Sequence, residues 1–152
     1  MITLKNTQRT VPIDPAAVIA DAQTILNTLH YADFDIGIWL CSNQTIKKYN
    51  KDYRGKDSAT DILSFAYHPE LKPGQRINVE IPEDKNLGDL IIAPLFVQND
   101  LARWGQTFTE RMHVLLVHGI CHLLGYDHID DADYKLMAQK EKSLLKILNK
   151  ES

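Results

Sequence analysis

Three histidines near the end of the chain have the spacing of a metal site. They lie in the segment HGICHLLGYDH, which begins at His118 and contains His122 and His128. His118 and His122 are four residues apart, so on a helix they project from one face. Gly125 can take a left-handed turn at little cost, which would bring His128 back to the other two. Three neutral imidazoles around one point suit a catalytic Zn²⁺ with one open coordination position, and such a site also binds nickel or cobalt.

This spacing resembles the zinc motif of the metzincin proteases, with one difference. In those proteases a glutamate follows the first histidine and acts as the general base. Here that position is Gly119, which cannot accept a proton. The motif therefore predicts a metal-dependent hydrolase but argues against the usual route of peptide hydrolysis. His30, His68 and His113 do not share the pattern, and we predict that they are not ligands.

Length and composition favour a single globular domain over residues 1–152. Hydrophobic residues make up 44% of the chain and charged residues 24%, which is typical of a folded domain with a core. No signal peptide is visible, and the apolar stretch 90–97 is too short to cross a membrane. The two cysteines, Cys41 and Cys121, give no disulfide framework and fit a reducing compartment.

A short basic cluster interrupts an otherwise slightly acidic chain. The net charge is -3, which by itself does not indicate binding to nucleic acid. Five basic residues nevertheless fall within ten positions, namely Lys47, Lys48, Lys51, Arg54 and Lys56. A solvated helix face would explain them. Beside a hydrolytic metal site, the same cluster is also a plausible contact for a phosphate backbone.

The pattern of apolar residues and caps predicts strands mixed with helices. The apolar residues indicate strands near residues 2–6, 34–41, 61–67 and 87–93, the last broken at Gly88-Asp89. Capping signals predict helices over 15–30, 43–52, 94–104, from 107 through His122, and 130–148. Residues 68–86 contain three prolines and should have little regular structure. We expect an α+β fold: a small mixed β-sheet packed with about five helices, with the histidine helix central.

Three segments together resemble the YbeY family of single-strand-specific metallo-endoribonucleases. They are residues 50–65 (NKDYRGKDSATDILSF), residues 87–92 (LGDLII) and residues 118–128. Their order and separation also fit, and the similarity covers essentially the whole chain. The departures are Ala59 where proline is frequent, Cys121 where a larger apolar residue is common, and the long segment 68–86. None of them falls on a proposed ligand.

The resemblance implies a zinc-type hydrolase that cleaves RNA. It implies roles in maturation of the 3′ end of small-subunit (16S-type) ribosomal RNA and in ribosome quality control, with the ribosome and ribosomal or GTPase assembly factors as partners. It implies that His118, His122 and His128 bind the metal, and that His118 is also a catalytic residue. It further implies a functional arginine, which in this chain is Arg54. The cytoplasm of a bacterium or the matrix of an organelle of bacterial descent fits equally well.

The residue types suggest how such a site would work. A cation held by neutral histidines can lower the pKa of water to about 7 and stabilise charge on a phosphoryl oxygen. Arg54 has a fork of donors suited to positioning a phosphate, and Lys56 is a second candidate. A structural ion pair of Arg54 with Asp57 or Asp61 is the competing interpretation. The general base is unassigned, and either hydroxide or the RNA 2′-hydroxyl could be the nucleophile.

Four further points stay open at this level. Asp89 and Asp127 could orient a ligand histidine or could simply bond to backbone. Cys121 could approach the ion, although small buried cysteines are common on helix faces. A metal-dependent hydrolase of another substrate would share the cage but should have a base near it. A non-catalytic, ribosome-associated metal-binding protein would more often close the site with a fourth ligand.

Overall fold

The computed structural model describes residues 1–151, and the side chains of residues 1–149. The elements follow the order β1 (Ile2–Asn6), α1 (Pro15–Thr28), β2 (Asp35–Leu40), α2 (Asn43–Arg54), β3 (Ile62–Ala66), the 3₁₀ helix η1 (Pro82–Asp84), β4 (Asn86–Ile92), α3 (Pro94–Asn99), α4 (Leu101–Trp104), α5 (Phe108–Leu123) and α6 (Asp131–Glu151). None of the helices in this described part is long and apolar enough to cross a membrane.

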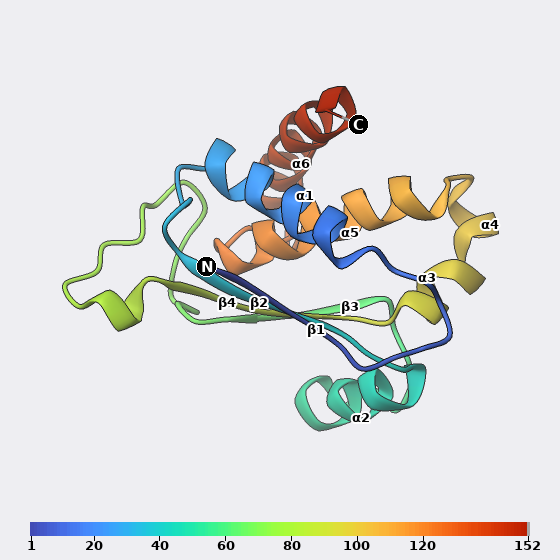
Figure 1. Ribbon diagram of the computed structural model, residues 1–152. Coiled ribbons are helices and arrows are strands. Elements are labelled where there is room, and N and C mark those ends of the chain that lie inside the picture. Colours follow the sequence, from blue (N-terminus) through green and yellow to red (C-terminus); the bar gives the residue numbers. More distant parts are fainter. Residues whose placement is uncertain (152) are drawn as a thin grey trace.

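The four strands form one mixed sheet in the order β1-β2-β4-β3. β1 pairs with β2 and β2 with β4 in parallel, whereas β3 runs antiparallel to β4 and forms one edge. Helices α1, α5 and α6 lie on one side of the sheet and α2 lies on the other (Figure 1). The predicted α+β class and mixed sheet are confirmed.

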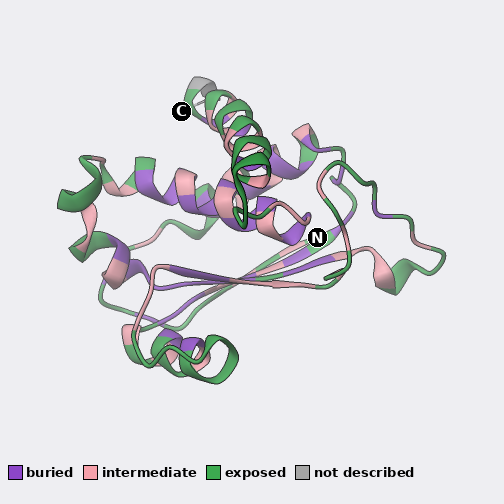
Figure 2. Cartoon of the chain, turned by 180° about the vertical axis from the view of Figure 1, so that it is seen from behind, coloured by how far each residue is buried: buried purple, intermediate pink, exposed green. Residues whose placement is uncertain are grey.

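The main core lies between the sheet and the α1–α5–α6 layer. In β2, Ile36, Ile38 and Leu40 are buried and alternate with more exposed residues, as expected of a strand with one face on the core. Helix α5 is buried along most of its length, with ten buried residues, and it packs against the sheet and α6 (Figure 2). The histidine helix is therefore central, as predicted.

Gly119 allows α5 to approach the sheet closely. A Cβ at this position would lie 2.8 Å from Ile62 Cδ1 and 2.8 Å from Leu90 Cδ2. The position where the proteases have glutamate thus faces β3 and β4 in the core. A carboxylate there would be aimed at apolar side chains, so the missing base has a packing reason.

Several predicted helix ends are confirmed by their caps. Asp14 accepts from Ala16 N with Pro15 in the first turn, and Thr107 and Glu110 form a complete capping box. The expected single helix over 94–104 is wrong: Asp100 leaves helical geometry at φ -101° and ψ 2°, which separates α3 from α4. The count is therefore six α-helices in the described residues rather than about five.

The expected interruption at Gly88 is a bulge within a continuous strand. Asp35 pairs with Asn86 but Ile36 pairs with Gly88, so Leu87 is the extra residue. Gly88 has a φ of 120°, and a Cβ there would collide with the carbonyl oxygen of Phe65. Only glycine meets both requirements. The segment 68–86 has little regular structure, as predicted, apart from η1.

Candidate active site

The three predicted ligands converge at the end of α5. His118 and His122 lie one turn apart on the helix, with their Nε2 atoms 3.0 Å apart. Gly125 then has a φ of 92°, so the predicted left-handed turn is present. It returns His128, whose ring centroid lies 5.9 Å from that of His118 and 5.5 Å from that of His122. The chain thus brings together three imidazoles within eleven residues of sequence.

The hydrogen bonds of the two helix histidines fix their tautomers. Nδ1 of His118 lies 3.0 Å from Glu141 Oε2, and Nδ1 of His122 lies 2.9 Å from the carbonyl oxygen of Tyr126. An ionised carboxylate and a carbonyl only accept, so each Nδ1 must be the donor. In the neutral rings, each Nε2 therefore presents a lone pair.

Two lone pairs that face each other at 3.0 Å repel unless a cation lies between them. Burial, and then the neighbouring His118, lower the pKa of His122, which disfavours a proton in that place. Two nitrogens bound to one tetrahedral zinc at about 2.0 Å each would lie about 3.3 Å apart. The observed separation is close to that value, so the pair is preorganised for a metal ion.

Asp127 adds a carboxylate to the group. One ligand atom each from His122, Asp127 and His128 lie within 4.8 Å of one another, a group that contains Asp127 and does not contain His118. We keep His118 in the metal set because its Nε2 lies 3.0 Å from Nε2 of His122. Asp127 Oδ1 also accepts from the backbone N–H of His128 at 2.8 Å. The described residues therefore offer three nitrogens and one nearby oxygen to an ion.

The histidines lie in a cleft of about 790 Å³ between α5 and the edge strand β3. Arg54, at the end of α2, lines this cleft together with Tyr53, Trp104 and Arg111. Arg54 is exposed, and the described residues provide no ion pair for it. Asp57 instead lies 3.9 Å from Lys47, and Asp61 lies 3.5 Å from Arg111. A guanidinium free to meet a ligand thus lines the same cleft as the histidines.

The other sequence candidates lie elsewhere. Lys56 is exposed but does not line the cleft, so its role as a phosphate contact stays a prediction. His113 is buried against Asp21 at 3.0 Å, and His68 lies 2.8 Å from the carbonyl oxygen of Asp84. Burial raises the pKa of Cys121 to about 12, so in the metal-free chain this side chain is a protonated thiol at neutral pH.

Sequence reasoning missed two groups of residues at the site. Glu141 comes from α6, and its distance in sequence from His118 left no local signal. Arg111 is held over the ring of Trp104 at 3.8 Å as well as against Asp61. The arrangement joins a loop, α4 and α5, and only the folded chain brings these segments together.

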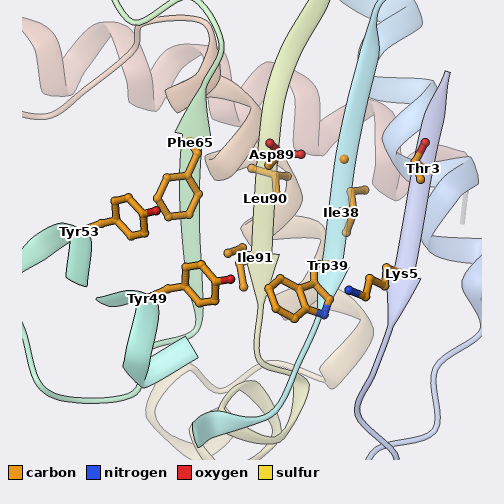
Figure 3. Close-up of a pocket in the computed structure, with 11 residues that line it drawn as sticks. Thr3, Lys5, Ile38, Trp39, Tyr49, Tyr53, Phe65, Asp89, Leu90 and Ile91 are labelled. Atoms are coloured by element: carbon orange, nitrogen blue, oxygen red, sulfur yellow. The ribbon is translucent and has the colours of Figure 1, made fainter. Parts of the chain in front are cut away.

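A second hollow lies on the opposite face of the sheet, and no histidine lines it. It has a volume of about 410 Å³ and is bordered by Trp39, Tyr49, Tyr53 and Phe65 (Figure 3). Asp89 lines this hollow and precedes Leu90, which faces α5. Successive strand residues point to opposite faces, so Asp89 cannot orient the histidines. Tyr53 and Phe65 line both hollows at the β3 edge.

Comparison with known proteins identifies the family to which this chain is related. The sequence model of the family Endoribonuclease YbeY matches residues 3–149. The protein Endoribonuclease YbeY of Homo sapiens is 33% identical over 144 residues, which cover 95% of this chain and 86% of that protein. Its counterparts in Fusobacterium nucleatum and Neisseria meningitidis are 36% and 40% identical, over 72% and 76% of this chain. The chain spans 64% of the length of each of these two.

A solved structure has the same fold. The solution structure of TM1509 from Thermotoga maritima matches with a TM-score of 0.62 and 24% identity, over 99% of this chain and 91% of that one. The resemblance inferred from three short segments is thus confirmed by a match over nearly the whole chain. The protein belongs to the endoribonuclease YbeY family.

Proposed function

We propose that this protein is a metal-dependent endoribonuclease that hydrolyses phosphodiester bonds in single-stranded RNA. The ion, Zn²⁺ in the first instance with nickel or cobalt as substitutes, is held by His118, His122 and His128. The observation that best supports the metal site is the 3.0 Å distance between the Nε2 atoms of His118 and His122. Each ring is held in this orientation by a hydrogen-bond acceptor at its Nδ1. RNA as substrate rests on family membership.

The cleft has features that suit an unpaired RNA strand. Arg54 can place a bidentate contact on a phosphate near the histidines. Tyr53 and Trp104 are 67% and 42% exposed, so each has ring surface that can contact splayed bases, although Arg111 lies over the ring of Trp104 and Tyr49 stacks on Tyr53. Arg111 is neutralised by Asp61 and is better placed to support Trp104 than to bind phosphate.

A bound ion would lower the pKa of a water molecule and would stabilise negative charge on a phosphoryl oxygen. The chain's own residues supply the positioning. The three histidines hold the ion at one end of the cleft, and Arg54 holds the scissile phosphate and stabilises its developing charge. Gly119 faces the sheet and supplies no base. Asp127 is the carboxylate closest in sequence to His128 and can hold a proton at its free oxygen.

The substrate class is tested by offering RNA and peptide to the same preparation. Purified protein is incubated with single-stranded RNA, with the matching duplex and with denatured casein, each with and without chelator. We expect chelator-sensitive cleavage of the single strand, slower cleavage of the duplex and intact casein. Cleavage of casein would support the hydrolase of another substrate, and chelator-sensitive metal binding without any cleavage would support the non-catalytic metal-binding protein.

In the cell, we propose that the substrate is small-subunit ribosomal RNA at its 3′ end, with the ribosome and its assembly factors as partners. The proposal of this substrate and these partners is based on the family to which the chain belongs. A bacterial cytoplasm, or an organelle matrix of bacterial descent, is the proposed location. Depletion of the protein should cause precursor 16S-type RNA with an extended 3′ end to accumulate, which primer-independent 3′-end sequencing measures.

A further inference from the structure

We propose that Glu141 is a positioning residue for the metal site and that it couples docking of the C-terminal helix to ion binding. This inference rests on the proposed assignment of His118 as a ligand. Its starting point is one contact: Oε2 of Glu141 lies 3.0 Å from Nδ1 of His118. The contact joins α6 to α5 across 23 residues of sequence.

Glu141 is held in place by its own helix. Met137 precedes it by four residues and Leu144 follows it by three, so all three project from one face of α6. Met137 and Leu144 are each 2% exposed and belong to the main core. The side chain of Glu141 is 23% exposed, and that of His118 is 31% exposed. A half-buried carboxylate on an anchored helix face therefore has little freedom to leave the imidazole.

The carboxylate acts on the metal site through the ring. As the acceptor at Nδ1, it selects the tautomer with the proton on that nitrogen and directs Nε2 toward His122. His122 obtains the same control from the backbone carbonyl of Tyr126. A carboxylate also makes the imidazole a stronger donor of its lone pair, because its negative charge stabilises the cation on the far side. Loss of such an outer partner typically weakens metal binding by about 10- to 100-fold.

The effect must run in both directions. If the Glu141 contact strengthens ion binding by a given factor, the ion strengthens docking of α6 by the same factor. Apart from Glu141, α6 packs on the core through apolar side chains, among them Met137, Leu144 and Leu148. The carboxylate of Glu141 thus connects α6 to a proposed metal ligand through a polar contact.

The experiment compares wild type with Glu141→Leu, Glu141→Gln and the control Glu83→Gln. Glu83 is an exposed carboxylate on η1 and does not line the cleft that contains His118, His122 and His128. The dissociation constant for Zn²⁺ is measured by competition with a chromophoric chelator. The tautomer of His118 is read in the metal-free protein from ¹⁵N–¹H correlations of the imidazole ring. Hydrogen exchange of residues 131–149 is followed with and without zinc.

We expect Glu141→Leu to bind zinc about 10- to 100-fold more weakly. Glu141→Gln, which keeps a neutral acceptor, should fall between wild type and Glu141→Leu. Wild type and Glu83→Gln should have the same affinity, His118 should be protonated at Nδ1 in both, and zinc should slow exchange in α6. In Glu141→Leu the His118 tautomer should become mixed, and zinc should no longer protect α6.

Equal zinc affinity and an unchanged His118 tautomer in Glu141→Leu would overturn the inference while leaving the metal site intact. Failure of the wild type to bind zinc would instead overturn the proposed function. A Glu141→Leu protein that fails to fold would be replaced by Glu141→Gln, for which a wild-type affinity and no change in zinc protection of α6 would equally contradict the proposal.

Discussion

Replacement of Gly125 by alanine should damage the metal site although it removes no ligand. Gly125 has a φ of 92°, in the left-handed region that residues with a Cβ rarely adopt. An added Cβ would also collide with the carbonyl oxygen of Leu71 and lie 2.8 Å from its carbonyl carbon. The strain and the collision together force either this turn or the segment around Leu71 to move.

The expected losses of stability and of zinc affinity in Gly125→Ala can be estimated from the backbone strain and from the residues that the turn positions. Backbone strain of this kind costs about 1–3 kcal/mol, which corresponds to a decrease in Tm of about 2–4 °C per kcal/mol for a domain of this size. The next residue, Tyr126, provides the carbonyl that bonds His122 Nδ1 at 2.9 Å, and His128 follows two residues later. Displacement of the turn disturbs both, so we expect zinc affinity to fall by about 10- to 100-fold.

The assay is a zinc competition titration beside a thermal melt of the metal-free protein. Gly105→Ala is the matched control, because Gly105 also has a positive φ, 62°, yet has open space at its Cβ position. It should lose about 1 kcal/mol of stability and keep its zinc affinity. Wild-type zinc affinity in Gly125→Ala would refute the reasoning, since the turn would then tolerate a side chain without moving His128.

Three further predictions concern the cleft, the helix packing and pH. Arg54→Ala should retain metal content and Tm but lose about 10²-fold in single-turnover RNA cleavage, with partial recovery in Arg54→Lys and a larger loss in Arg54→Glu; a stable, metal-loaded and fully active Arg54→Ala would exclude this residue. Gly119→Ala should destabilise the protein by about 1–3 kcal/mol in denaturant unfolding, because its Cβ overpacks Ile62 and Leu90; unchanged stability would show that α5 can shift freely. Burial lowers the pKa of His122, so the unfolded chain binds a proton at this residue more readily than the folded chain does. The free energy of unfolding of the metal-free protein should therefore decrease as the pH falls below about 6.5, and it should decrease less in His122→Ala. Equal decreases in both proteins would contradict this prediction.

The features that sequence predicted well are set by neighbouring residues. The capping box at Thr107 and Glu110, the left-handed Gly125 and the helical pairing of His118 with His122 each depend on a stretch of five residues or fewer. Such signals do not depend on tertiary contacts, so they can be identified in the amino-acid sequence alone. The class of fold followed from them, because strands and helices were placed in the correct order.

The features that sequence did not reveal depend on contacts between distant segments. Glu141 meets His118 only because α6 folds back onto α5, and nothing near residue 141 indicates a partner. Asp61 was considered as a partner of Arg54, yet it pairs with Arg111, fifty residues away. The sequence does not identify the general base for a related reason, since its identity depends on which carboxylate the fold brings to the ion.

The most direct test of this account is a titration of metal into metal-free protein, followed by the rate of cleavage of a single-stranded RNA. We expect cleavage to be absent without metal and to rise linearly to a plateau at one equivalent of Zn²⁺. His122→Ala should remain inactive over the same range, because it removes one of the two facing nitrogens. Full cleavage by thoroughly metal-free wild type, or by His122→Ala at one equivalent, would contradict the assignment of the three histidines as the catalytic metal site.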